Sequence, residues 1–263
     1  MDVVADLHVH TTASDGRLTV PELPAAARRA GVGVVAVTDH DRLHPDLEAP
    51  VTTREGVTVI RGIELQVETA TGRVDLLGYG VAETSALRAE LDRIQADRAE
   101  RARRMTEQVE DRLDVSLDVA FEAGVGRPHV ARAVDASDAD CDYAGAFERF
   151  IGDDGPCYVS RTVPSVERGL DLLADAAAVV SLAHPFRYAD SESALDLAPR
   201  LDGLERYYPY GRPVDEGRLD AVIDRHGLLA TGGSDAHDDR LGLAGLGGDE
   251  YARIASHLPD AQG

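Results

Sequence analysis

Short runs of apolar residues, rich in valine and other β-branched side chains, recur along the chain. Uninterrupted runs of this kind are typical of strands that are buried on both faces, as in a parallel sheet. We therefore expect six strands, in addition to a strand-like segment near the N-terminus. They cover residues 32–37, 57–63, 74–79, 179–183, 201–208 and 227–231.

Helix signals alternate with these runs. Thr19 and Glu22 have the spacing of a capping box, an Ala/Arg stretch follows them, and Gly31 is suited to end that helix. Further helices are expected after Pro164 and over residues 215–226. This alternation predicts an α/β fold with a largely parallel sheet, similar to a TIM barrel.

Residues 83–163 interrupt the alternation. The interval opens with a long Arg/Glu/Ala segment, residues 87–113, which predicts an exposed helix carrying opposite charges on its surface. We therefore expect a barrel domain built from residues 1–82 and 164–263. Residues 83–163 would form a helical insertion beside the active site.

Histidine and acidic residues cluster where the apolar runs end. His8 and His10 are two residues apart, so on an extended strand both imidazoles point to the same side. Six of the nine histidines lie in such segments or in the segment Arg127-Pro128-His129. The ends of parallel strands meet at one face of a barrel, so the series predicts a multinuclear metal site. The later segments are residues 14–16, 37–41, 62–65, 183–185 and 232–237.

The order of these motifs closely resembles the PHP (polymerase and histidinol phosphatase) family of metal-dependent phosphoesterases, over nearly the whole chain. Residues 126–129 and 146–150 are most similar to the branch that hydrolyses nucleotide phosphates, including 3′,5′-nucleoside bisphosphates. The resemblance implies a distorted (β/α)7 barrel. It also implies two or three bound divalent ions, drawn from manganese, zinc, iron and magnesium.

The resemblance further implies which residues are metal ligands. His8, His10 and Asp235 would hold a first ion. Glu64 would bridge that ion to a second, which His184 and Asp75 would also hold. Asp15, His40 and His237 would hold the third.

Asp75 departs from the family pattern, since relatives carry histidine at this position before Leu-Leu-Gly. A carboxylate can still bind a metal and would favour harder ions such as manganese or magnesium. The alternative is that Asp75 is a solvated strand-end residue and that the site is partly empty.

Bound divalent ions would neutralise phosphate oxygens, lower the pKa of a bound water and orient hydroxide for in-line attack. Glu64 and His129 are the catalytic candidates, and Arg127 and His129 the candidates for substrate binding. The guanidinium of Arg127 would grip a second phosphate, and the imidazole of His129 would bond or protonate a leaving oxygen. The alternative for this segment is an ordinary helix start with a capping neighbour. We expect a solvated ion-pair face for three arginines on the long helix, Arg98, Arg101 and Arg103.

Other functions fit parts of this pattern. An amidohydrolase barrel also begins with His-x-His, but its commonest binuclear form needs a carbamylated lysine, and the chain contains no lysine. Within the resembled family, a histidinol phosphatase and a 5′-to-3′ exoribonuclease acting on short RNA use related chemistry. A metal-binding module without catalysis is a further alternative.

Charge narrows the choice of partners. The net charge of −21 comes from 48 acidic against 27 basic residues, and every basic residue is arginine. Such a surface disfavours binding of duplex DNA and is compatible with a small phosphorylated substrate or short RNA. No stretch approaches the ~20 apolar residues that a membrane span needs, so we expect a cytoplasmic protein without a membrane partner. Cys141 and Cys157 are expected to be free thiols.

The acidic composition is typical of proteins adapted to high salt, where repulsion is screened within ~3 Å at 1 M. We predict that the protein needs salt to reach full stability. A thermal unfolding series from low to molar salt measures this. Full folding without added salt would contradict the prediction.

Overall fold

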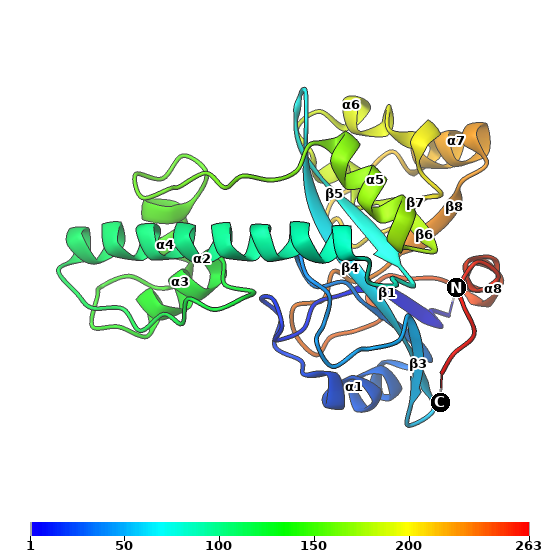
Figure 1. The fold of residues 1–263 in the computed structure, drawn as a ribbon, viewed down its shortest axis with the longest axis horizontal. Coiled ribbons are helices and arrows are strands. Elements are labelled where there is room, and N and C mark those ends of the chain that lie inside the picture. Colours follow the sequence, from blue (N-terminus) through cyan, green and yellow to red (C-terminus); the bar gives the residue numbers. More distant parts are fainter. Residues whose placement is uncertain (1, 263) are drawn as a thin grey trace. The chain divides into compact units, whose positions relative to one another are not determined.

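The computed structural model of the protein describes residues 2–262 and divides into two compact units (Figure 1). The first runs to Arg88 and resumes at Val163, and the second comprises Ala89–Thr162. Helix α2 (Ser85–Leu113) begins in the first unit and continues into the second. Among the described residues, no helix is long and apolar enough to cross a membrane.

The first unit is built on a curled sheet of eight strands in the order β1-β2-β4-β5-β6-β7-β8, with β3 paired to β4. After β8 the chain reaches β1 again, where Ala236 forms a parallel bridge with Val9. The strands are β1 (Ala5–Val9), β2 (Val34–Val37), β3 (Val51–Arg54), β4 (Val57–Thr69), β5 (Gly72–Tyr79), β6 (Val179–Leu182), β7 (Gly203–Tyr207) and β8 (Leu229–Gly232).

The expectation of a largely parallel sheet holds on the two sides of this sheet but is wrong at its centre. β1, β2 and β4 run parallel, as do β6, β7 and β8. In contrast, β5 is antiparallel to both β4 and β6. β4 and β5 form one long hairpin that turns at Thr69 and Gly72, which leaves no room for the helix that a parallel crossover requires. β3 was not predicted, and it too pairs antiparallel to β4.

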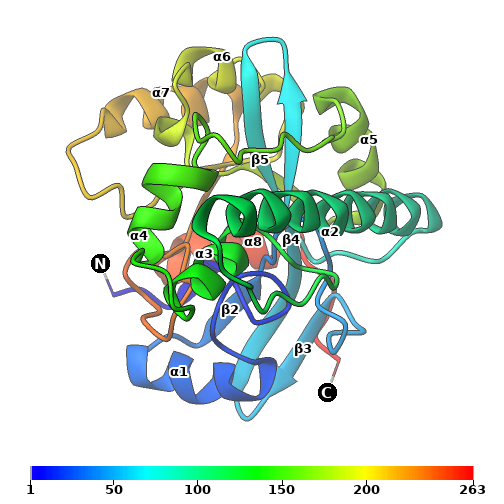
Figure 2. The same ribbon diagram turned by 90° about the vertical axis from the view of Figure 1, so that its left-hand side faces the viewer.

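Helices lie around the curled sheet (Figure 2). The predicted capping box is present, because Glu22 Oε2 accepts from the backbone N–H and the hydroxyl of Thr19 at 2.8 and 2.7 Å. Gly31 ends α1 in the left-handed conformation (φ 74°) that favours glycine. The short helices α6 and α8 were not predicted. The helices of this unit are α1 (Leu23–Ala30), α5 (Val166–Ala176), α6 (Ser191–Leu195), α7 (Glu216–His226) and α8 (Gly248–Ala255), with 3-10 turns η1 (Val20–Glu22), η3 (Pro185–Arg187) and η4 (Ala198–Arg200).

Two apolar clusters explain why the strand sequences are hydrophobic without interruption. One packs α1 against β2 and β4, through residues such as Ala26, Val35 and Val59. The other includes Leu7 from β1 and Leu77 from β5. Both sides of the sheet are therefore buried, as the apolar runs indicated.

The second unit is helical and has a core of its own. Val109 of α2 packs there with residues such as Val130 and Ile151. The long helix predicted at residues 87–113 is confirmed as α2, although part of its surface is buried in this core. Cys141 and Cys157 are free, and Cys157 is buried. The remaining elements are α3 (Arg127–Asp135), α4 (Tyr143–Ala146) and the π-helical turn η2 (Phe147–Ile151).

Candidate metal centre

Eight of the nine predicted metal ligands lie in three overlapping groups, and within each group the ligand atoms lie within 4.8 Å of one another. His8 belongs to two of these groups, and so does His10. The overlap places the groups side by side in one centre. They are His8, His10 and Asp235; His8, Glu64 and His184; and His10, Asp15, His40 and His237.

The parallel strands bring these side chains together. His40 follows β2 and forms a parallel bridge with Glu64. Val37, the last residue of β2, has its pairing partner on β4. Glu64 lies three residues beyond that partner, in the middle of β4. Glu64 is therefore level with the ends of the neighbouring strands, although β4 itself continues into the hairpin. His184 follows β6, and Asp235 follows β8.

Asp75 is the one predicted ligand outside the three groups. Because β5 is antiparallel, Asp75 lies near the start of its strand, opposite Gln66, whose side-chain amide donates to Asp75 Oδ1 at 3.0 Å. Its Oδ2 lies 3.9 Å from Nε2 of His184. The side chain is only 14% exposed, which argues against the alternative of a solvated strand-end residue. Burial, and after it the charge of Glu64, raises the pKa of Asp75.

Glu64 lies between the groups with its two oxygens facing different histidines. Oε1 is 3.4 Å from His8 Nε2 and 3.0 Å from His184 Nε2. Oε2 is 3.4 Å from His10 Nε2 and 2.8 Å from His40 Nδ1. A carboxylate that faces two neighbouring ligand groups in this way has the geometry needed to bridge two ions.

The residues present fit divalent metal ions. His8 Nε2 is buried and has no hydrogen-bond partner among the described residues. Nevertheless, Glu64 Oε1 and Asp235 Oδ1 lie 3.4 and 3.6 Å from it. A buried ring nitrogen that faces carboxylate oxygens without hydrogen-bond geometry is placed to bind a metal ion once its proton has been released. The mixed nitrogen and oxygen donors suit manganese, zinc and iron better than magnesium, which prefers oxygen ligands.

Charge coupling dominates the electrostatics of the centre. Burial alone would lower the pKa of His8, but the charges of Glu205, Glu64 and Asp235 outweigh it and raise the pKa well above its ordinary value. Burial alone would raise the pKa of Glu64, yet the charges of His40 and His8 hold it well below its usual range. Likewise, burial alone would raise the pKa of Asp235, but the charge of His8 and the hydrogen bond with His10 lower it. Glu64 and Asp235 therefore stay ionised next to the positively charged ring of His8.

The third group is more open than the other two. His237 is 40% exposed and His40 27% exposed, whereas Asp15 is 8% exposed. Asp15 lies 3.3 Å from His237 and 3.8 Å from His40. Although burial opposes ionisation, the charge of His40 and the hydrogen bond from His237 lower the pKa of Asp15. This side of the centre is thus the one that solvent reaches most easily.

Several residues that support the ligands were not among the predicted site residues. Asp39 accepts from the backbone N–H of Thr11 at 2.8 Å and from the hydroxyl of Ser14 at 2.6 Å, which folds the loop leading to Asp15. Asp6 accepts from the backbone N–H of Ser234 at 2.8 Å, beside Asp235. The signal in the sequence was a charged residue inside or at the edge of an apolar strand.

Glu205 is a third such residue, a charged side chain inside the apolar run at residues 201–208. It is fully buried on β7 and contacts both His8 and His184.

Close packing also requires glycine at position 233, because a Cβ atom there would lie 2.2 Å from the backbone nitrogen of His8.

Two candidate ligands have strained backbone conformations. His184 (φ 27°) and Asp235 (φ 50°) adopt positive φ, which non-glycine residues rarely do. Such strain is found mainly at functional sites, where the surrounding structure enforces it. Asp235 Oδ2 accepts from the Tyr208 hydroxyl at 2.8 Å and from Arg187 at 2.9 Å. These bonds turn Asp235 Oδ1 toward His10, whose Nε2 lies 3.1 Å away.

The second unit carries the two predicted substrate residues at the start of α3. His129 Nδ1 accepts from the backbone N–H of Gly126 at 3.2 Å, so the capping alternative describes part of its environment. Arg127 donates to Asp153 at 2.6 Å and lies over the rings of Phe147 and Tyr158. Arg127 is thus held in place while its ion-pair partner Asp153 is 79% exposed.

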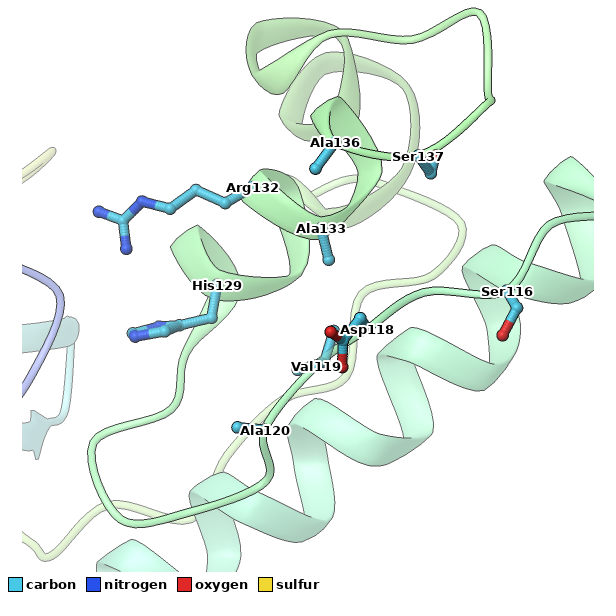
Figure 3. Close-up of a pocket in the computed structure, with 9 residues that line it drawn as sticks. All are labelled: Ser116, Asp118, Val119, Ala120, His129, Arg132, Ala133, Ala136 and Ser137. Carbon is cyan, nitrogen blue, oxygen red and sulfur yellow. The ribbon is translucent and has the colours of Figure 1, made fainter.

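A pocket of about 380 Å³ lies between α3 and the segment at residues 116–120 (Figure 3). His129 and Arg132 extend from α3 in the same direction, and Asp118 lies on the opposite segment. Small side chains such as Ala133 line the remainder. The pocket therefore offers both charged groups and an apolar wall.

Our expectation of a solvated ion-pair face is wrong for Arg98 and Arg101. Arg98 is buried and donates to the carbonyl of Val125 at 3.0 Å. Burial, and after it the charges of Arg127 and Arg161, lower the pKa of Arg101 to about 10. The helical unit thus gathers several guanidinium groups. Arg103, in contrast, pairs with the exposed Glu100 at 3.1 Å, as expected.

Comparisons with known proteins agree with this geometry. Residues 6–122 match the model of the PHP domain family. The chain is 30% identical over 254 residues to a 3′,5′-nucleoside bisphosphate phosphatase of Chromobacterium violaceum, covering 88% of this chain and 86% of that protein. It is 28% identical over 250 residues to the 5′-3′ exoribonuclease Rnm of Escherichia coli, with coverage of 89% and 85%. A solved structure from Bifidobacterium adolescentis, assigned as a metal-dependent phosphoesterase, superimposes with a TM-score of 0.80 at 26% identity, covering 97% and 96% of the two chains.

We predict that His10→Ala lowers the number of Mn²⁺ ions bound per chain, because His10 belongs to two ligand groups. Metal content after equilibrium dialysis measures this directly. In the wild type, Mn²⁺ at 100 times its Kd should stabilise the fold by about 2.7 kcal/mol, and this gain should shrink in the variant. The exposed His257→Ala is the matched control. Unchanged stoichiometry and affinity in His10→Ala would contradict the proposed ligand set.

Proposed function

The chain belongs to the PHP domain family of metal-dependent phosphoesterases, and we propose that it hydrolyses a small phosphorylated metabolite, namely a nucleotide such as a 3′,5′-nucleoside bisphosphate or AMP. The protein is therefore a hydrolase that acts on phosphoester bonds. The observation that carries the proposal is Glu64, whose two oxygens face separate histidine groups. Two adjoining cation sites are suited to phosphoester hydrolysis, because they can stabilise both the attacking and the leaving oxygen.

We further propose that the curled sheet is a distorted (β/α)7 barrel, with residues 83–163 as its insertion. In this proposal the nine ligands are those predicted from the sequence, and Asp75 completes the shell of the ion held by Glu64 and His184. The proximity of Asp75 to His184, 3.9 Å, supports its inclusion. Two or three ions would then be bound.

Each part of the centre has its own task in this proposal. Divalent ions, when bound, supply positive charge to the phosphate oxygens and lower the pKa of a coordinated water. Glu64 and Asp235 hold negative charge in the buried centre. The more exposed third group, with His40 and His237, provides the side from which substrate enters.

The arginines of the helical unit support an anionic substrate with more than one phosphate. A guanidinium next to other guanidinium groups is stabilised by a bound anion, and arginine binds phosphate in a bidentate manner. We propose that Arg127 binds the second phosphate. His129 would contribute a hydrogen bond or a proton from Nε2, since Nδ1 accepts from Gly126.

A 5′-to-3′ exoribonuclease acting on short RNA is the second candidate. The same arginines would bind the phosphate that follows the scissile bond, which supports this activity as well as the first. The net charge of −21 disfavours long duplexes, so we do not propose duplex DNA as a partner.

We predict that the protein with Mn²⁺ releases phosphate from adenosine 3′,5′-bisphosphate and that Glu64→Gln lowers kcat by more than about 100-fold, since even residues that only support metal ligands affect activity by 10–100-fold. The assay panel also contains AMP, histidinol phosphate and a short 5′-phosphorylated RNA. Exposed Glu216→Gln serves as the control. Hydrolysis of the RNA alone would favour the exoribonuclease, and hydrolysis of none of the compounds by metal-loaded protein would overturn the proposal.

We predict that Arg127→Ala raises KM for the bisphosphate by about 10- to 100-fold, because a hydrogen bond to a charged group contributes about 1.5–3 kcal/mol. KM for AMP, which lacks the second phosphate, should change little. Steady-state kinetics on both substrates give the comparison, with Arg103→Ala as a control on the same unit. An equal effect on both substrates would contradict the assignment.

A further inference from the structure

Glu205 is a fully buried carboxylate on β7 that belongs to none of the three ligand groups. Its Oε1 lies 2.9 Å from Nδ1 of His8. Its Oε2 accepts the backbone N–H of His184 at 2.6 Å. A buried carboxylate is tolerated only where such partners satisfy it, and both partners of Glu205 are candidate metal ligands.

The bond to His8 determines which ring nitrogen faces the centre. When Nδ1 carries the proton and donates it to Glu205, Nε2 presents its lone pair to the space between Glu64 and Asp235. A carboxylate behind a metal-binding histidine fixes the tautomer and the orientation of the ring, and makes the ring a better ligand. His8 belongs to two groups, so its orientation affects both.

The bond to His184 acts on the backbone. His184 adopts φ 27°, a conformation that must be held by its surroundings. Its N–H points to Glu205 Oε2, and its own Nε2 lies 3.0 Å from Glu64. The carboxylate of Glu205 therefore joins the chain at β1 to the turn that follows β6.

The sheet fixes the direction of the Glu205 side chain. Glu205 pairs with Thr231 of β8, and the register then shifts before Tyr207 pairs with Gly232. Such bulges are frequent next to active sites, where they direct a side chain. Glu205 occupies the last regular position before the irregularity.

We propose that Glu205 is a positioning residue that sets the tautomer of His8 and fixes the turn at His184, and thereby raises the affinity of the centre for divalent ions. This inference rests on the proposed function in one respect, namely that the centre binds metal. It goes further in assigning a role to a residue that does not itself bind the ion.

The substitution Glu205→Gln separates this role from a merely structural one. The amide keeps the size of the side chain but has one oxygen, which can replace only one of the two carboxylate oxygens that face His8 and His184. If its NH₂ group faces His8 Nδ1, the proton of the neutral ring is forced onto Nε2, where it blocks metal binding. Glu205→Asp keeps the charge but shortens the reach, and provides a second variant should the first fail to fold.

The experiment measures the Kd for Mn²⁺ by calorimetric titration of the full chain, together with the Tm of the metal-free protein. We expect Kd to rise by about 10- to 100-fold in Glu205→Gln and Glu205→Asp, as for other carboxylates behind metal-binding histidines. The exposed Glu216→Gln should match the wild type. In Zn²⁺-loaded protein, nitrogen NMR should show the His8 proton on Nδ1 in the wild type.

Two outcomes overturn the proposal and are distinguishable. If the wild type binds Mn²⁺ and the folded Glu205 variants bind it within about twofold of the same Kd, Glu205 is only structural, even where the Tm of the metal-free variants falls. If the wild type binds no Mn²⁺, the proposed function and this inference fail together.

Discussion

The interaction of the buried Glu64 carboxylate with the histidines around it is the one on which the remainder of the structure depends. A charge with 1% exposure at the centre of a sheet is tolerated only if opposite charge surrounds it. Histidines at the ends of three other strands lie around it at distances of 2.8 to 3.4 Å, although burial lowers the pKa of one of them, His10. Among these rings, the pKa of His8 is raised while that of Glu64 is lowered, so each stabilises the ionised form of the other. Divalent ions would take over this role and leave the histidines neutral.

The sheet is shaped so that these groups can meet. Parallel strands on both sides deliver His40, His184 and Asp235 at their carboxyl ends, as in other α/β folds with sites at strand ends. The antiparallel hairpin of β4 and β5 interrupts that rule. It allows Glu64 to lie inside a strand and places Asp75 opposite Gln66, two residues further along β4. A site built in this way needs tight approaches, and the glycine at position 233 beside His8 is one of them.

The sequence predicted the elements with strong local signals. Helix α1 was predicted from Thr19, Glu22 and Gly31, and the buried strands were predicted from their valine-rich runs. The eight grouped ligands lie in segments where histidine and acidic residues follow strand ends, and the resemblance to the PHP family implied which of these residues bind metal. What could not be predicted depends on contacts that are distant in sequence. The hairpin direction of β5 is decided by pairing along its whole length, and the burial of Arg98 by the fold of the helical unit around it.

The same dependence on distant contacts explains why Glu205 was not identified as a site residue. In the sequence it is a single charge within an apolar strand, which has no distinctive spacing to any histidine. Only when β7 lies between β6 and β8 do its two oxygens reach His8 and His184, 197 and 21 residues away in sequence. A charged residue in the middle of a buried strand must find partners, because its desolvation would otherwise cost several kcal/mol. Such a residue therefore indicates a polar network even where its members cannot be named from the sequence alone.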